Sequence, residues 1–448
     1  MRRLLPSLLV CFAAGSALLA QRAGVTASAD RFTPDQYRAW ARDFGTPLYV
    51  YDGDRVVANY RRIAAAFRAL YPATRVHYAI KANSNRAILR LIRREGAGAE
   101  VVSEGEIDLA LHEGFAGRDI LFTSNSKSSS EIDRALAVGA ILNVDSRDEL
   151  EQIARRAGEL GKTARISFRL NPAVDPHTHA RIATGVVDSK FGLHLADGIA
   201  ERAVARALEL APQVKLVGLH THIGSQITSP EPYRMAAEEV LDFVVALHRE
   251  RGVELEFVDL GGGLGIPYQD GQEVMSADDW AHALVEPLLA RRADLGRLPE
   301  LWIEPGRALV ADAGLLLTRV NSVKTTPIQT FVNVDAGFNT LARPLLYDAY
   351  HRVRIVGKQG TGPTVTVAGN VCESGDILAK ARDLPATAAG DLALFLDAGA
   401  YGFSMASEYN SRPLPAEILV RGRRVDLVRS RESFRDLLRN QKLPRDLE

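Results

Sequence analysis

The stretch HYAIKANSN (77–85) joins an alternating apolar run to a small polar turn. Val76, Tyr78 and Ile80 recur at every second residue, which is typical of a strand with one buried face. The asparagine-rich turn that follows ends the strand. We therefore expect the amine of Lys81 to lie at the mouth of a strand, where it either forms a Schiff base or is simply solvated.

Strand-like and helix-like stretches alternate on both sides of this lysine. Residues 54–70 have apolar side chains at helical spacing, and helical stretches separate most of the apolar runs that follow. About eight such units predict an α/β fold, a TIM-like parallel (β/α)8 barrel over residues 30–305. The expected strands are 76–80, 99–102, 120–123, 141–144, 165–170, 215–219, 255–260 and 301–303.

The pattern changes after Pro305. Short β-branched runs punctuated by Gly, Pro and Asp indicate a β-rich second domain, a barrel or sandwich, over residues 306–448. An alternative packs residues 30–50 with this second domain. The expected strands of the second domain are 330–334, 364–367, 392–396 and 417–420.

Composition favours a small-molecule partner. The 448 residues include 55 Lys+Arg and 55 Asp+Glu, so no overall positive field attracts nucleic acid. Two cysteines, Cys11 and Cys372, exclude a disulfide framework. His220 and His222 have no nearby cysteine or third histidine, and we therefore expect no metal site.

The first 29 residues differ from the rest of the chain. Two arginines precede an apolar run over residues 4–20, and small residues follow it, as in an export leader. Proline and glycine interrupt the run, which is also shorter than the roughly 20 apolar residues that a transmembrane helix needs. The alternatives are a disordered extension or a misassigned start codon, and we expect no membrane segment in the mature protein.

Five polar motifs each follow a run of apolar residues. Because the carboxyl ends of the strands of a parallel barrel meet at one face, the motifs are expected to share one pocket. The second domain is expected to contribute the last two. The motifs are HTHIGSQ (220–226), DLGGGLG (259–265), EPGR (304–307), CESGD (372–376) and DAGAYG (397–402).

Single residues in these motifs suit an anionic, heterocyclic ligand. The glycines of 261–265 and Ser225 suit a phosphate, although a tight turn and a helix cap explain them equally. Glu304 suits a protonated ring nitrogen, and Arg307 suits a carboxylate or phosphate; a surface ion pair is the alternative for both. His222 either lies against a ring or is an ordinary core histidine.

Taken together, the motifs resemble those of the fold-type III pyridoxal-phosphate decarboxylases, and most closely the branch that acts on meso-2,6-diaminopimelate. The resemblance runs from about residue 45 to residue 421, and before it the leader and a helix-like segment at 34–44 replace the usual family sequence. The matching stretches are YAIKAN, RLNPAVDPHTHARIATGVVDSKFG (169–192), GLHTHIGSQI, DLGGGLGIPY, EPGR, CESGDIL and DAGAYG.

The resemblance implies a pyridoxal 5'-phosphate cofactor bound covalently to Lys81. It also implies that His222 stacks on the ring and that Glu304 pairs with the pyridine nitrogen. Cys372 is the implied proton donor, delivered by the partner subunit of a homodimer. The residues implied around the cofactor phosphate are Ser225, Gly262, Gly263 and Tyr401, and Gly306 and Arg307 are also implied to bind the cofactor. Those implied for the substrate are Arg307, Arg343, Tyr347, Glu373 and Tyr401.

The implied activity is decarboxylation of meso-2,6-diaminopimelate to L-lysine and CO2, which places the protein in the cytoplasm unless residues 1–29 export it. One alternative is a related enzyme, a decarboxylase of ornithine, arginine or lysine or an amino-acid racemase. A racemase requires a second base opposite Lys81, and no clear candidate is visible. Another alternative is a non-catalytic cofactor carrier, but such carriers lack a β domain and a cysteine loop.

Overall fold

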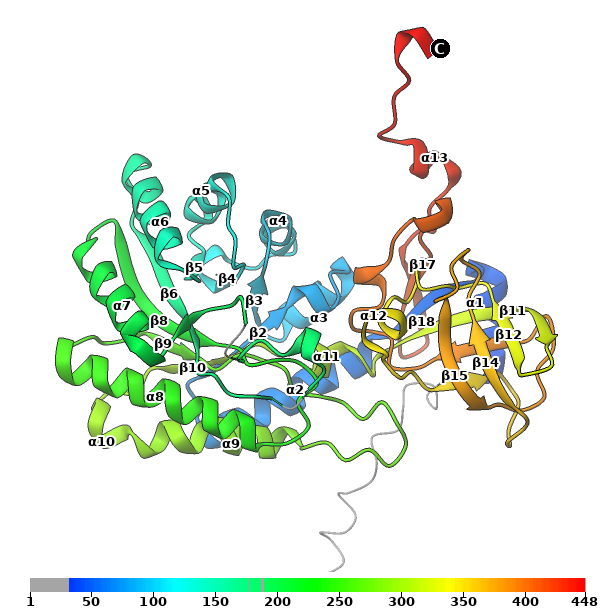
Figure 1. Ribbon diagram of the computed structural model, residues 1–448, viewed down its shortest axis with the longest axis horizontal. Coiled ribbons are helices and arrows are strands. Elements are labelled where there is room, and N and C mark those ends of the chain that lie inside the picture. The colour runs from blue at the N-terminus through cyan, green and yellow to red at the C-terminus, as the bar shows by residue number, and fades with distance from the viewer. Residues whose placement is uncertain (1–31, 177, 187–188, 448) are drawn as a thin grey trace, which may run out of the picture.

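In the computed structural model the chain forms two domains that lie side by side along the long axis (Figure 1). The structure describes residues 32–176, 178–186 and 189–447. The expected leader at 1–29 lies outside the described residues. Within the described part, no helix is both long enough and apolar enough to cross a membrane.

The first domain is a closed barrel of eight parallel strands, which confirms the predicted (β/α)8 fold. Each strand pairs in parallel with its neighbours in the order β5-β4-β3-β2-β10-β9-β8-β6, and pairing between β6 and β5 closes the ring. The short β7 (Leu193–His194) pairs with β6 outside the ring. The barrel strands are β2 (Thr74–Ala79), β3 (Gly98–Val101), β4 (Ile120–Phe122), β5 (Ile141–Val144), β6 (Ala164–Asn171), β8 (Val214–Thr221), β9 (Phe257–Asp259) and β10 (Glu300–Ile303).

Helices cover the outside of the barrel, and their ends follow local sequence signals. Ser128 begins α5 with a capping box that includes Glu131, and Gly139 ends the helix in the left-handed conformation. The helices around the barrel are α2 (Gly53–Leu70), α3 (Arg86–Arg94), α4 (Glu104–His112), α5 (Ser129–Val138), α6 (Arg147–Glu159), α7 (Ile199–Glu209), α8 (Glu231–Arg251), α9 (Ala277–Ala290), α10 (Arg292–Leu295) and α11 (Arg307–Val310).

Aromatic side chains fill the amino-terminal end of the barrel. The rings of Phe257 and Trp302 stack with centroids 3.7 Å apart, and the ring of His77 lies 4.1 Å from that of Trp302. His77 is completely buried, and neither ring nitrogen has a hydrogen-bond partner among the described residues. Burial lowers the pKa of His77 to about 3, so the ring is neutral.

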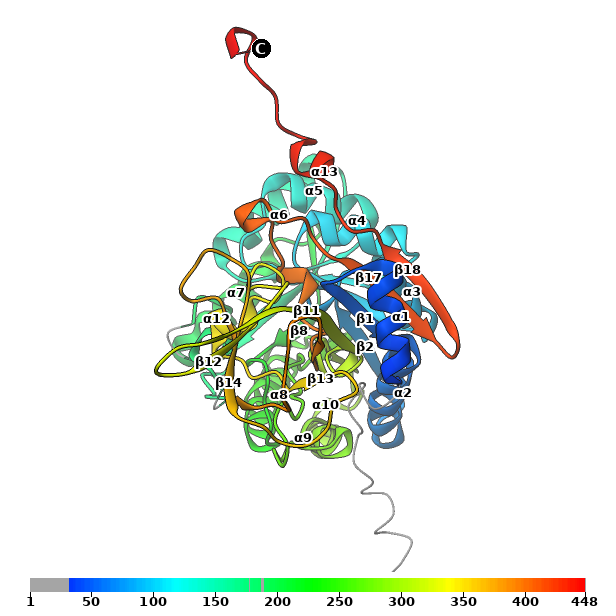
Figure 2. The same ribbon diagram turned by 90° about the vertical axis from the view of Figure 1, so that its right-hand side faces the viewer.

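The second domain is a mixed sheet in the order β15-β14-β12-β11-β1-β17-β18, with β16 pairing to β11 and β13. It lies in front of the barrel in Figure 2. Its strands are β1 (Leu48–Asp52), β11 (Gly314–Thr325), β12 (Thr330–Val334), β13 (Val353–Ile355), β14 (Thr364–Ala368), β15 (Ile377–Asp383), β16 (Leu392–Phe395), β17 (Ala416–Arg421) and β18 (Arg424–Arg429). Two short helices belong to this part of the chain, α12 (Arg343–Tyr347) and α13 (Phe434–Leu438).

The second sheet includes β1, which precedes the barrel in the sequence. β1 pairs antiparallel with β11 and parallel with β17. The helix α1 (Pro34–Phe44) buries Tyr37 and Trp40 in a core that it shares with strands of this sheet. Residues 34–52 are therefore part of the sheet domain in space, although they lie next to the barrel in sequence.

Candidate active site

Lys81 lies at the carboxyl end of β2, in a single 3-10 turn at Ile80–Ala82. Its amine lies 2.7 and 2.8 Å from the two carboxylate oxygens of Glu100 on β3, and Thr123 also donates to that carboxylate. Burial alone would lower the pKa of Lys81, but Glu100, Tyr401 and Glu304 outweigh burial and raise it. Glu100 thus holds the Lys81 amine in place as an ammonium.

A cavity of about 320 Å³ opens over Lys81, and His222 and Glu304 line it as well. Burial and the neighbouring Lys81 charge lower the pKa of His222 to about 3, so this ring is neutral. Burial would raise the pKa of Glu304, but His220 and Lys81 outweigh it and keep the carboxylate ionised. The amine of Lys81, the neutral ring of His222 and the carboxylate of Glu304 therefore share a single cavity.

The residues expected around a phosphate gather beside this cavity. A side chain at Gly262 would lie 1.9 Å from the carbonyl oxygen of Glu304, and one at Gly263 would lie 2.1 Å from that of Gly224. Gly263 also has φ +99°, so glycine is required at both positions. Gly306 packs against Ala79 and Ala82 of the Lys81 turn.

Arg307 links the phosphate region to a second cavity. Its guanidinium donates to Ser225 Oγ at 3.0 Å and to the Tyr268 hydroxyl at 2.7 Å, and it lies 5.0 Å from the ring of Tyr401. The backbone N–H of Tyr401 donates to Ala82, next to Lys81. Ser225, Arg307 and Tyr401 therefore meet beside the lysine.

The second cavity, of about 310 Å³, is lined by Arg307, Arg343 and Tyr347. The guanidinium of Arg343 lies 4.7 Å from the centre of the Tyr268 ring and donates to Nε2 of His351 at 2.9 Å. Both arginines are at most 6% exposed. The expected substrate arginines thus lie together, both beside the ring of Tyr268.

Cys372 and Glu373 do not line either cavity. They lie in the connection between β14 and β15, where both are exposed, and the backbone N–H of Cys372 donates to Asn410. Within one chain, the structure therefore brings together Lys81, His222, Glu304 and the phosphate and arginine groups, but not this pair.

Several residues at the site were not predicted. Glu100 lies inside an expected strand. An acidic residue in such an apolar run could have indicated a buried partner, because acidic residues are almost never fully buried unless they are paired. Arg169, His220 and Asp259 lie in the quoted motifs, but neighbouring residues of the same motifs were expected at the site instead. Tyr268 ends the quoted stretch DLGGGLGIPY but was not singled out there, and nothing in the sequence distinguished His351.

Pyridoxal phosphate fits this set of groups. The carboxylate oxygen Oε1 of Glu304 is buried without a hydrogen-bond partner among the described residues, so it has lone pairs for a ring N–H. Lys81 offers an amine for an aldehyde. Glycines, a serine and an arginine surround the place expected for an anion.

Comparisons with known proteins agree with this geometry. Residues 55–311 match the family described as "Pyridoxal-dependent decarboxylase, pyridoxal binding domain". The diaminopimelate decarboxylase of Archaeoglobus fulgidus is 46% identical over 408 residues, which are 90% of this chain and 94% of the relative. The chain belongs to the diaminopimelate decarboxylase family. It is a pyridoxal-phosphate-dependent carboxy-lyase.

Solved structures of the family have the same architecture. The M. jannaschii diaminopimelate decarboxylase in complex with L-lysine superimposes with a TM-score of 0.87 at 41% identity, covering 92% of this chain and 95% of the relative. The lysine/ornithine decarboxylase of Vibrio vulnificus in complex with putrescine gives a TM-score of 0.74 at 26% identity, covering 86% and 98%. The similarity is thus higher to the diaminopimelate enzyme.

Proposed function

We propose that this protein removes one carboxylate of meso-2,6-diaminopimelate as CO2 and releases L-lysine, the last step of lysine biosynthesis. The observation that carries the proposal is the buried pair Arg307 and Arg343. Their side-chain hydrogen bonds go to Tyr268, Ser225 and His351, and among the described residues neither forms an ion pair with a carboxylate. Because unpaired buried charge is costly, this cavity favours an anionic ligand.

Diaminopimelate supplies that anion, because it has a second amino-acid group at its far end. Arg307, Arg343 and Tyr347 bind the far carboxylate in the second cavity. Fixing the far end sets the orientation of the near end, and the bond to be broken must stand perpendicular to the cofactor ring. Lysine and ornithine lack the far carboxylate and leave the two arginines unpaired.

At the near end, Lys81 holds the cofactor covalently and later moves a proton at the reacting carbon. Pyridoxal phosphate, when bound, supplies a conjugated, positively charged ring that accepts the electron pair left by departing CO2. Glu304 accepts a hydrogen bond from the protonated ring nitrogen, and the neutral His222 lies against the ring without adding charge. The phosphate is bound by Ser225, Gly262, Gly263 and Tyr401, and Gly306 also lies beside the cofactor.

We infer that the enzyme is a homodimer whose active sites are shared between subunits. Cys372 would donate the final proton and Glu373 would bind the far ammonium, each from the partner subunit. Their exposure on one loop, away from both cavities of their own chain, supports this assignment.

Mixing two inactive variants tests the shared site. Lys81→Ala and Cys372→Ala dimers, unfolded and refolded together in equal amounts, would form heterodimers with one complete site each. We expect about 25% of wild-type activity, because about half of the dimers are mixed and each has one intact site. Refolded single variants are the control. Activity no higher than theirs would contradict the shared site.

We place the enzyme in the cytoplasm, where lysine biosynthesis uses it. The leader-like residues 1–29 are the opposing observation, and an export signal there would place it outside. Cell fractionation of the full chain and of a chain without residues 1–29 separates the two. Full-length protein in the periplasm, with the shortened chain retained inside, would refute the cytoplasmic assignment.

The activity itself is tested with a substrate panel. Purified protein is incubated with meso-diaminopimelate, L-lysine, L-ornithine and L-arginine, and CO2 and amino-acid products are followed. We expect L-lysine from diaminopimelate, no turnover by Lys81→Ala, and a borohydride-reduced cofactor on the peptide that contains Lys81. Diamine products or racemized substrate would replace the proposal with the corresponding related enzyme.

A further inference from the structure

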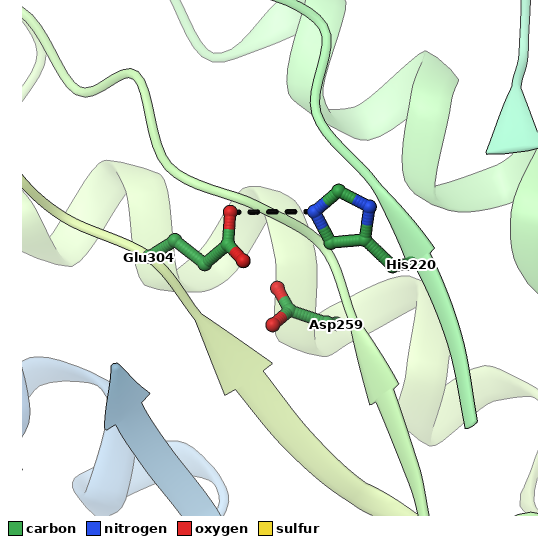
Figure 3. Close-up of side chains that lie close together, drawn as sticks. All are labelled: His220, Asp259 and Glu304. Carbon is green, nitrogen blue, oxygen red and sulfur yellow. Dashed lines mark hydrogen bonds and ion pairs between the residues drawn. The ribbon is translucent and has the colours of Figure 1, made fainter. Parts of the chain in front are cut away.

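Glu304 ends a buried chain of hydrogen bonds that crosses the inside of the barrel. The hydroxyl of Ser167 on β6 donates to Oδ1 of Asn143 on β5 at 2.8 Å. Nδ2 of Asn143 lies 3.0 Å from Nδ1 of His220 on β8, and Nε2 of His220 lies 3.3 Å from Oε2 of Glu304 (Figure 3). All four side chains are buried.

The Glu304 carboxylate sets the direction of each hydrogen bond in this chain. An ionised carboxylate only accepts, so Nε2 of His220 carries a hydrogen and donates it. An amide nitrogen only donates, so Nδ1 accepts from Nδ2 of Asn143, whose oxygen accepts from Ser167. The opposite amide orientation would turn a ring lone pair toward the carboxylate. The chain thus selects one tautomer of His220.

Asp259 places a second carboxyl group beside Glu304 (Figure 3). Nitrogen or oxygen atoms of His220, Asp259 and Glu304 lie within 4.8 Å of one another, a donor set that a metal could use. The hydrogen on Nε2 occupies the position that a metal would need on His220. We therefore interpret the cluster as a hydrogen-bonded group.

The two carboxyl groups differ in ionisation. Oδ1 of Asp259 accepts the backbone N–H of Gly261 at 2.8 Å, whereas Oδ2 is buried without a partner among the described residues. Burial and the neighbouring Glu304 charge raise the pKa of Asp259 well above its usual range. Asp259 therefore holds its proton more tightly than an ordinary aspartate, beside a carboxylate that stays ionised.

We propose that the chain from Ser167 through Asn143 to His220, together with the neighbouring Asp259, positions Glu304 and keeps it ionised. The inference rests on the proposed pairing of Glu304 with the ring nitrogen of the cofactor. These four are positioning residues, because they act through Glu304. Without them Glu304 takes the ring proton for itself, and the ring loses the charge that makes it an electron acceptor.

Charged and titratable groups face Glu304 from several elements. His220 on β8 and His222 beyond it, Lys81 after β2 and Asp259 on β9 act on it most directly. Arg169 on β6 and His77 on β2 lie close enough to sense its charge. Of these groups, His220 is the one that donates a hydrogen bond to the carboxylate among the described residues.

The test measures cofactor binding and the spectrum of the bound cofactor, which involve no substrate. Apoprotein is reconstituted with pyridoxal phosphate, and the pH midpoint of the visible absorbance change is recorded. For His220→Phe we expect about tenfold weaker cofactor binding, from one lost charged hydrogen bond. The midpoint should rise by about one pH unit, because the nitrogen linking Lys81 to the cofactor is more basic when the ring is uncharged.

Graded variants separate positioning from folding. Asn143→Leu removes the donor to Nδ1 and should shift the midpoint in the same direction. Ser167→Ala, which only frees the amide, should shift it least. His220→Gln retains an N–H donor and should restore most of the midpoint. Asn59→Leu is the matched control, since Asn59 is a buried asparagine whose hydrogen bonds go to Leu309 and Asp312, outside both cavities.

Two results would overturn the inference. The first is an unchanged midpoint and cofactor affinity in His220→Phe or, if that variant does not fold, in Asn143→Leu. The second is lower thermal stability alone, equal to that of Asn59→Leu, which would assign the chain to folding. Failure to decarboxylate diaminopimelate would refute the proposed substrate but would leave these cofactor measurements unchanged, so the two failures are distinguishable.

Discussion

Replacing His77 with leucine should make the protein much less sensitive to acid. The wild-type ring is neutral in the folded state, with a pKa of about 3, and titrates near 6.5 once unfolded. Below pH 6.5 the unfolded chain binds a proton that the folded chain does not, so stability falls as pH decreases toward 3. Above pH 6.5 the histidine contributes no pH dependence.

The magnitude follows from the pKa difference. Two pH units below 6.5, at pH 4.5, the loss is about 2.7 kcal/mol at 1.36 kcal/mol per unit. Near neutral pH, leucine loses the contact with Trp302, roughly 0.5–1.5 kcal/mol, but removes two buried nitrogens that have no partner among the described residues. These two effects oppose each other, so the pH dependence is the decisive quantity.

Urea unfolding at pH 7.5 and pH 4.5 measures this difference, with tryptophan fluorescence as the signal because Trp302 lies against the substituted ring. Wild type should lose about 2.7 kcal/mol more than His77→Leu between the two values. Val217→Ala is the control, because Val217 belongs to the apolar cluster that contains Phe257 and Trp302 and has no titratable group; it should lower stability equally at both pH values. Equal pH dependence of wild type and His77→Leu would refute the reasoning.

Three further predictions concern the site. His351 donates from Nδ1 to the carbonyl oxygen of Leu396 at 2.8 Å, so its Nε2 must accept from Arg343. His351→Leu should therefore raise KM for diaminopimelate roughly tenfold, with a smaller change in kcat. An unchanged KM in initial-rate assays would contradict this. Cys372→Ala should keep the visible cofactor absorbance while kcat falls about 100-fold or more; wild-type turnover would exclude Cys372 as the donor. Glu100→Gln should lower the pKa of Lys81, because the Glu100 carboxylate raises it. Stopped-flow reconstitution should then show covalent attachment of the cofactor beginning at lower pH. An unshifted pH profile would count against the ion pair.

The alternation of apolar runs was enough to predict the barrel. All eight expected strands are present, and residues 141–144 match β5 at both ends. The strand before Lys81 ends one residue earlier than expected, at Ala79, because Ile80–Ala82 turn into a 3-10 helix. Strand periodicity indicates which face is buried but does not indicate where the backbone begins to turn.

The sequence did not predict which residues of neighbouring strands lie opposite each other. Glu100 meets Lys81 because β2 and β3 pair with Ala79 opposite Glu100, and a single sequence does not contain that register. His220 and His222 are two residues apart, and which of them donates to Glu304 depends on Asn143, far away in the chain. The position of β1 in the second sheet depends likewise on distant partners.

The central place of β1 in the second sheet has a consequence for synthesis of the chain. The barrel strands, residues 74–303, leave the ribosome in one continuous block and can close as soon as β10 emerges. β1 is made before all of them, yet its partner β17 is among the last strands to appear. The edge of β1 that pairs with β17 therefore stays open until residues 416–421 have been translated, and for most of synthesis it can pair with another chain instead.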